Sequence, residues 1–326
     1  GSVYTVTGIA NNAFSNYKNV TYVNVSEGVT NMGIATFSYC ENLETVELGE
    51  GIKKISSSLF NGCANLWDIN IPASVTEIDG SAFEGCASLA SIDIPANVTN
   101  IVEYAFFDCQ NLASINVDDK NTTYSSVDGV LYNKEKTILV QVPAKFQGKF
   151  TIPSGVTKIA SGAFGSCEGL NGVEIPNTVT SISEFAFENC TGLTNLTIPS
   201  SVKYIDWKAF KGCENLDVVI RNAEEDVTVG SGALDDCKSV TWKIIDESES
   251  PLKFKVLTET TAEVIKENCV EGSVTIPSKV VIDGKTYSVV SIAYQAFKNC
   301  KGLTNITIPS SVIKIDNEAF KNSGLT

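Results

Sequence analysis

The sequence predicts an α/β repeat solenoid, in which short structural units stack along one axis. The first observation is a fixed period, since phenylalanine recurs every 23 residues in three series: Phe14, Phe37, Phe60, Phe83 and Phe106; Phe164, Phe187 and Phe210; Phe297 and Phe320. The second is that strand-type and turn-type patterns alternate within each period. Such a period is typical of units that cannot bury their apolar face alone and must stack on their neighbours.

The first part of each repeat reads as a short strand. Ile92 and Ile94 alternate with Ser91 and Asp93, which is the period of two that a strand with one buried face requires. Pro95 follows and should end the strand, because proline has no N–H to donate to a neighbouring strand.

The rest of the repeat predicts a second extended piece and a turn. Val98 and Ile101 should point inward from the extended piece. Ala105, Phe106 and Cys109 have helical spacing and predict a short helical turn. Stacked units would therefore place a parallel sheet on one side of the solenoid and helical turns opposite.

The complete pattern is Leu-x-x-Ile-x-Ile-Pro-x-x-Val-x-x-Ile followed by Ala-Phe-x-x-Cys, and it covers most of the chain. It resembles the leucine-rich repeat, in particular the BspA-like (Treponema-type) class of bacterial surface proteins. The resemblance implies a right-handed, curved solenoid with the parallel sheet on its concave side, exported to the cell surface or beyond and serving adhesion or protein binding. Some units depart from the pattern: Tyr17 and Ser323 replace cysteine, Thr36 and Leu59 replace alanine, and Leu234 replaces phenylalanine.

Two interruptions divide the chain. We expect a repeat array over residues 1–245, with a β-hairpin insertion near 117–150 that extends from the array. Residues 246–251 are acidic and predict a linker or an exposed corner. Residues 252–326 then read as a second entry module with another hairpin and the start of further repeats. Residues 284–297 align without gaps with residues 1–14, so we expect the chain to be a fragment of a longer surface protein.

Composition restricts the function. The chain has a formal net charge of −14, which disfavours nucleic acid and anionic membrane surfaces as partners. It contains no histidine, which removes the commonest general base and the commonest transition-metal ligand. No apolar run is long enough to predict direct membrane insertion. We therefore expect no catalytic residue, metal or cofactor, and an extracellular or cell-surface location, with any signal or anchor outside this chain.

Nine of the ten cysteines occupy one position of the repeat: 40, 63, 86, 109, 167, 190, 213, 237 and 300. A disulfide ladder or a metal site would be the functional interpretation. We favour a small, buried and unreactive thiol, because metal ligands cluster and free cysteine is often buried. Only Cys269 lies outside the series.

Strand residues that alternate with the buried ones should line the concave face. The candidate partner-binding residues on or beside it are Tyr22, Asn24, Glu47, Trp67, Asp68, Asn70, Asp93, Asn116 and Glu174. The expected partner is an extracellular protein of the host or of a neighbouring cell. The alternatives are a structural spacer that projects other domains and, less favoured, a two-carboxylate glycosidase. A binder differs from a spacer in carrying clustered aromatic or charged residues on one face.

Overall fold

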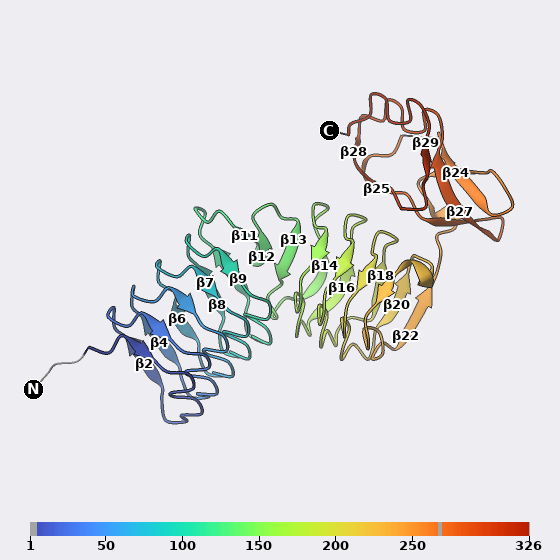
Figure 1. Ribbon diagram of the computed structural model, residues 1–326. Helices are drawn as coiled ribbons and strands as arrows, with labels where there is room; N and C mark the ends of the chain where they lie inside the picture. Colours follow the sequence, from blue (N-terminus) through green and yellow to red (C-terminus); the bar gives the residue numbers. More distant parts are fainter. Residues whose placement is uncertain (1–4, 267–268, 326) are drawn as a thin grey trace, which may run out of the picture.

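The computed structural model describes residues 5–266 and 269–325. It is a solenoid whose coils carry parallel strands, as Figure 1 shows. Each regular coil has one longer strand, one two-residue strand and one stretch of turns. The predicted parallel sheet is therefore confirmed, and so is the second extended piece of the repeat, since Asn100–Ile101 forms β9.

The longer strands form one face of the solenoid, which we call the ladder face. Its strands are β2 (Tyr22–Val25), β4 (Thr45–Leu48), β6 (Asp68–Asn70), β8 (Ser91–Ile94), β10 (Ser114–Val117), β14 (Gly148–Thr151), β16 (Leu170–Glu174), β18 (Asn195–Ile198), β20 (Asp217–Ile220) and β22 (Ser239–Trp242). Pairing is in register with the repeat, so that Val23 lies beside Val46 and Val46 beside Ile69.

The two-residue strands form a second ladder. They are β1 (Gly8–Ile9), β3 (Asn31–Met32), β5 (Lys54–Ile55), β7 (Glu77–Ile78), β9 (Asn100–Ile101), β15 (Lys158–Ile159), β17 (Ser181–Ile182), β19 (Tyr204–Ile205) and β21 (Thr228–Val229). In most of these strands one apolar side chain points inward, and Ile55 and Ile78 are fully buried, whereas Val229 of β21 is exposed. The coil is thus closed by apolar side chains from both ladders.

The predicted helical turns are wrong. Within the described residues the helices are two short 3-10 segments, η1 (Glu224–Asp226) and η2 (Glu247–Glu249), and neither contains an Ala-Phe pair. Around Phe60 the backbone instead makes consecutive tight turns, in which Leu59 N–H donates to Ser56 O (3.1 Å) and Asn61 N–H to Ser58 O (3.1 Å). The α class is therefore not observed, and the chain is a β-solenoid.

Left-handed backbone conformations are the reason that the Ala-Phe segment forms turns and not a helix. Ser58 and Gly62, two residues before and after Phe60, have φ values of +55° and +71°, which an α-helix does not tolerate. This conformation aims alternate N–H groups at the next coil, so that Phe60 N–H donates to Ala82 O (2.9 Å) and Gly62 N–H to Glu84 O (2.7 Å). The turns therefore hold the coils together as the strands do.

The repeated phenylalanines form the centre of the core. Phe37, Phe60 and Phe83 stack with nearly parallel rings, 5.8 and 5.6 Å apart between centroids. Rings at the ends are less covered: Phe14 is 37% exposed and Phe320 is half-buried. Repeat phenylalanines in the interior coils are thus buried, whereas these two, in the first and last Ala-Phe coils of the described chain, are partly open to solvent.

The cysteine thiol has a role beyond filling space. Cys86 Sγ donates to the carbonyl oxygen of Phe60 in the preceding coil (3.3 Å), and Cys63 donates in the same way to Phe37 O (3.1 Å). Seven free repeat cysteines are buried, as predicted, and Cys237 is half-buried. Burial raises the pKa of the Cys63 thiol to about 12.

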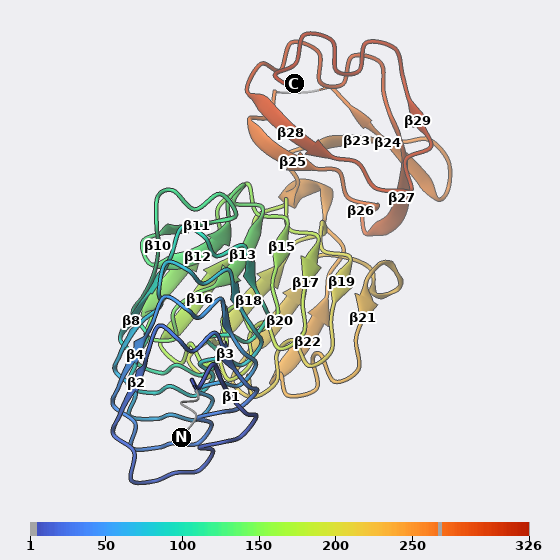
Figure 2. The ribbon, with the colours of Figure 1, turned by 60° about the vertical axis from the view of Figure 1, so that its left-hand side comes forward.

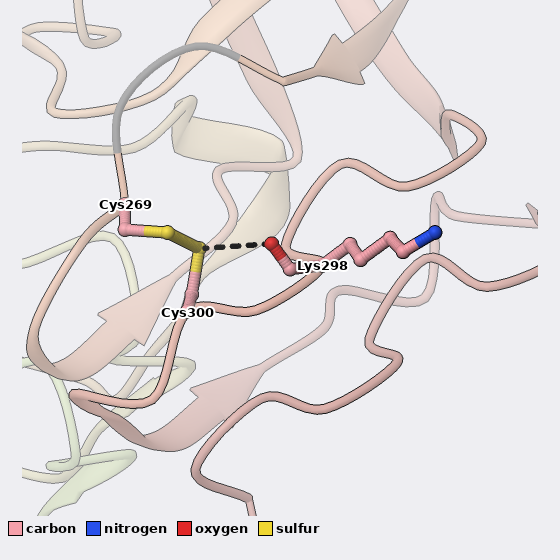
Figure 3. The surroundings of a disulfide bond; sticks show 3 residues. All are labelled: Cys269, Lys298 and Cys300. Atoms are coloured by element: carbon pink, nitrogen blue, oxygen red, sulfur yellow. Dashed lines mark hydrogen bonds between the residues drawn. A yellow bond between two sulfur atoms is a disulfide. The ribbon is translucent and has the colours of Figure 1, made fainter.

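The cysteine prediction fails at Cys300, which forms a disulfide with Cys269 (Figure 3). The Lys298 carbonyl oxygen lies 4.0 Å from Cys300 Sγ. Cys300 belongs to the first Ala-Phe coil of its module, where no preceding phenylalanine carbonyl is available to accept a thiol hydrogen. The sulfur of Cys300 is instead bonded to that of Cys269.

The predicted hairpin near 117–150 is present, but it is built into the array and does not extend from it. The insertion forms β11 (Tyr124–Val127), β12 (Val130–Asn133) and β13 (Ile138–Gln141), paired antiparallel, and β13 then pairs parallel with β15. Because side chains alternate along β12, Leu131 packs in the apolar core of the coils before the insertion. Val130 and Tyr132 pack in the apolar core of the coils after it. The insertion therefore joins the two cores.

Residues 252–325 form a smaller module with its own apolar core, which includes Phe254, Val289 and Phe297. Its strands are β23 (Lys253–Val256), β24 (Thr261–Ile265), β25 (Gly272–Thr275), β26 (Lys279–Ile282), β27 (Lys285–Ile292), β28 (Leu303–Thr307) and β29 (Lys314–Ile315). The predicted hairpin is the antiparallel pair β23–β24. A second hairpin, β26–β27, was not predicted. Figures 1 and 2 show the module beside the end of the array.

The aligned segments 1–14 and 284–297 are alike where both are described. Ile9 pairs parallel with Met32, and Ile292 pairs parallel with Ile315, one period further along in each case. Residues 1–4 of the first segment lie outside the described residues.

Candidate functional site

The first five strands of the ladder face bring most of the predicted site residues together. Register places Asn24 beside Glu47, Glu47 beside Asn70, and Asp93 beside Asn116. All nine candidate residues are exposed, and for the eight that lie on strands this is what their alternation with more buried strand residues predicts. Amide and carboxylate side chains therefore alternate along one row, which we call the acidic row: Asn24, Glu47, Asn70, Asp93 and Asn116.

Hydrogen bonds organise the acidic row. Asn24 Nδ2 donates to Glu47 Oε2 (2.7 Å), and Asn116 Nδ2 donates to Asp93 Oδ1 (2.9 Å). Neighbouring strands lie about 4.8 Å apart, so each intervening amide keeps the carboxylates about two strand spacings apart. The row can thus hold ordered negative charge without placing two carboxylates side by side.

Two aromatic side chains flank the acidic row. Tyr22 is 50% exposed, and its hydroxyl accepts a hydrogen bond from Asn24 Nδ2 (3.0 Å). Trp67 directly precedes β6 and is 57% exposed. Asp68, the next residue, adds a third carboxylate beside the row. This end of the ladder face therefore combines apolar contact area with negative charge.

Glu174 is separated from the other candidates. It lies on β16, beyond the insertion, where Lys149 Nζ lies 2.5 Å from its Oε1 and Thr151 Oγ1 donates to its Oε2 (2.8 Å). The hydrogen bond from Lys149 is the main reason that the pKa of Glu174 is lowered. Its charge is thus neutralised locally, and it does not extend the acidic row.

Sequence reasoning missed a cleft of about 680 Å³ between the second stretch of the ladder face and the C-terminal module. One wall comes from β16 and β18, and the other from residues 249–251 and β25. Thr275 Oγ1 donates to Asn177 O (2.8 Å) across the contact between the C-terminal module and the array, which we call the junction. These residues are 98 positions apart, and no repeat pattern signals the contact.

Polar contacts also join the C-terminal module to the end of the array. Lys279 Nζ forms an ion pair with Glu225, and Ser278 Oγ donates to Asp226 Oδ2 (2.8 Å). In the acidic stretch 246–251, Glu249 binds Arg221 and lies 2.6 Å from Lys243 Nζ. Glu249 therefore attaches this stretch to the array through two basic partners.

Among residues 5–266 and 269–325 there is no group of three or more histidine, cysteine, aspartate or glutamate side chains arranged to hold a metal ion. The described part of the chain likewise contains no helix long and apolar enough to cross a membrane.

Similar structures come from several bacteria. A leucine-rich repeat protein from Eubacterium ventriosum is 26% identical, with a TM-score of 0.63 over 98% of this chain and 81% of that one. A leucine rich cell surface protein from Faecalibacterium prausnitzii is also 26% identical, with a TM-score of 0.52 and the same coverage. The pneumococcal vaccine antigen PcpA is 19% identical, with a TM-score of 0.62 over 96% and 85%, and shows the fold alone.

No curated protein matches the sequence. The family described as "BspA type Leucine rich repeat region" matches in six copies, over residues 7–128, 145–261 and 263–326. These ranges include nearly all of the coils described above. The chain therefore belongs to the BspA-type leucine-rich repeat family.

Proposed function

We propose that this chain is a non-enzymatic protein-binding module of a secreted or cell-surface protein, and that it binds a basic segment of an extracellular partner at the acidic row. The observation that carries the proposal is the composition of the ladder face from β2 to β10. Its outward-facing side chains include Glu47, Asp68 and Asp93, and none is lysine or arginine.

Charge and aromatic area would contribute differently to binding. Like charges on one face concentrate negative potential, which accelerates encounter with a cationic partner and weakens as salt is added. Exposed Trp67 and Tyr22 supply area that a partner could bury, and such aromatic anchors often dominate interface energy. The amide–carboxylate hydrogen bonds would fix the polar side chains before the partner arrives, which lowers the entropic cost of binding.

Two observations support an extracellular location. The 26% identical Faecalibacterium prausnitzii protein is described as a cell surface protein. The Cys269–Cys300 disulfide suits an oxidising compartment, because disulfides are rare in the reducing cytosol.

The test begins with an array of extracellular matrix and serum proteins screened against the purified chain. A captured partner is then measured against the double variant Glu47→Lys/Asp93→Lys at low and high salt. We expect a loss of at least tenfold in affinity at low salt and a smaller loss at high salt. The matched control is Glu103→Lys/Glu214→Lys, which changes net charge equally at exposed positions outside the acidic row and should bind like the parent.

Trp67→Ala should weaken the same partner at all salt concentrations, because its contribution would come from buried area. If both the charge variant and Trp67→Ala bind like the parent, the acidic row is not the site. If the parent captures nothing, the spacer function is favoured, in which the repeats project other parts of a longer protein.

A further inference from the structure

The junction cleft contains an unpaired strand edge. Strand β25 pairs with β28 on one side, and no other strand pairs with it in the described part of the chain. Ser273, Val274 and Thr275 of β25 line the cleft, whereas no residue of β28 does. In Figure 2, β25 lies on the side of the module that faces the array. The open edge of β25 is therefore directed into the cleft.

The backbone of β25 presents hydrogen-bonding groups along that edge. Ile276 N–H donates to Thr307 O of β28 (2.9 Å). Because the direction of N–H groups alternates along a strand, those of Thr275 and Ser273 point away from β28. Val274 between them is buried in the module core, which fixes the orientation of the strand. Two N–H groups are thus held in place without a strand partner.

The charged residues of the cleft are already paired with one another. Lys149 binds Glu174, and Arg221 and Lys243 bind Glu249. The other polar side chains on the array wall include Asn171, Asn195 and Thr197, which are uncharged. An ionic ligand would have to break existing pairs, whereas a neutral ligand would leave them intact.

From these observations we infer that the cleft binds an extended, uncharged peptide segment of a partner protein, which adds to β25 as a further strand. Strand addition at an exposed edge derives its affinity from main-chain hydrogen bonds. The four residues of β25 span about 13 Å at a rise of about 3.3 Å per residue, enough for a segment of four or five residues. The cleft volume lies in the range of ligand-binding sites. This site is distinct from the acidic row, and the inference does not depend on the proposed function.

The experiment titrates isotope-labelled protein with the capped peptide acetyl-Thr-Val-Thr-Val-Thr-amide and follows amide resonances by NMR. The Ser273 and Thr275 amides should shift most, together with those of Asn195 and Thr197 on the opposite wall. Two further peptides carry backbone N-methyl groups, one on the threonines and the other on the valines. Because only alternate N–H groups of an added strand face its neighbour, one methylated peptide should lose at least tenfold in affinity and the other should bind like the parent.

A pair of variants tests the protein side. Ser273→Pro removes one outward N–H group and should weaken the parent peptide at least tenfold, whereas Ser273→Ala keeps that group and should bind normally. Unchanged resonances elsewhere in the module would show that both variants fold. The inference is overturned if no shift appears at millimolar peptide, if the shifts fall outside the cleft, or if both methylated peptides behave alike. The N-methyl comparison uses the parent protein and therefore decides the matter even if Ser273→Pro does not fold.

Discussion

Removing one ring from the middle of a phenylalanine stack should destabilise the array strongly. Phe187 is fully buried, with ring centroids 4.7 Å from Phe164 and 5.0 Å from Phe210. A buried phenyl side chain removes roughly 150–200 Å² from water, and at about 25 cal/mol per Å² this amounts to about 4–5 kcal/mol. Measured core substitutions of this type cost about 3–5 kcal/mol, so we expect Phe187→Ala to lower the free energy of unfolding by that amount.

A phenylalanine at the end of the stack provides the control for Phe187→Ala. Phe14 is 37% exposed and stacks on Phe37 alone, at 5.3 Å, so we expect Phe14→Ala to cost about two-thirds as much. Urea unfolding followed by circular dichroism gives the two free energies. Hydrogen exchange of each coil then shows whether the loss is local, since coils of a solenoid can open separately. Equal losses at the two positions would refute the argument that stacking on both sides determines the cost.

Three further predictions follow from the cysteines and the junction. In native protein a thiol reagent should label Cys237 at most, and denaturant should expose the seven buried repeat thiols as well; rapid native labelling of those seven would contradict their burial. Replacing Cys269 and Cys300 together by serine should destabilise the C-terminal module by about 3–4 kcal/mol, from the entropy of closing a loop with a sequence separation of 31, and hydrogen exchange should change there and not in the array. Ion pairing lowers the pKa of Glu225 and Glu249, so the stability that they add to the docked module is complete above the carboxyl pKa of the unfolded chain, about 4.3, and is lost as the pH falls further. The radius of gyration from small-angle scattering should therefore increase between about pH 4 and pH 2, and an identical value at both pH values would exclude this contribution.

The strand positions of the repeat could be predicted because they depend on local alternation. Ile92 and Ile94 are buried while Ser91 and Asp93 are exposed, as the period of two requires. Constant spacing then determined the register, which is why neighbours such as Asn24 and Glu47 in the acidic row were correctly aligned.

The turns were mispredicted because the spacing of Ala, Phe and Cys is compatible with both a helix and a pair of tight turns. A signal was present two residues after the phenylalanine, where Asn16, Gly62, Gly85 and Asn189 have positive φ. Glycine and asparagine are the residues that adopt this conformation most readily. Their recurrence at a fixed position indicates turns and not a helix.

The junction cleft and the disulfide could not be predicted because both depend on contacts outside the repeat. Cys269 precedes Cys300 by 31 residues, which is not a multiple of the period. Thr275 meets Asn177 only because the C-terminal module is placed against the array. A periodic pattern predicts the stacking of coils and carries no information about how one stack meets another.

The sharing of β12 between two cores has a mechanical consequence for a chain that is pulled at its ends. Leu131 on one side of the strand and Tyr132 on the other must leave separate apolar environments before the insertion can extend. At residues 243–250 the attachments include the ion pairs of Glu249 with Arg221 and Lys243, and ion pairs rupture over short extensions. Under tension the C-terminal module should therefore separate from the array first. The two stretches of coils on either side of the insertion should unfold only at a higher force, and together.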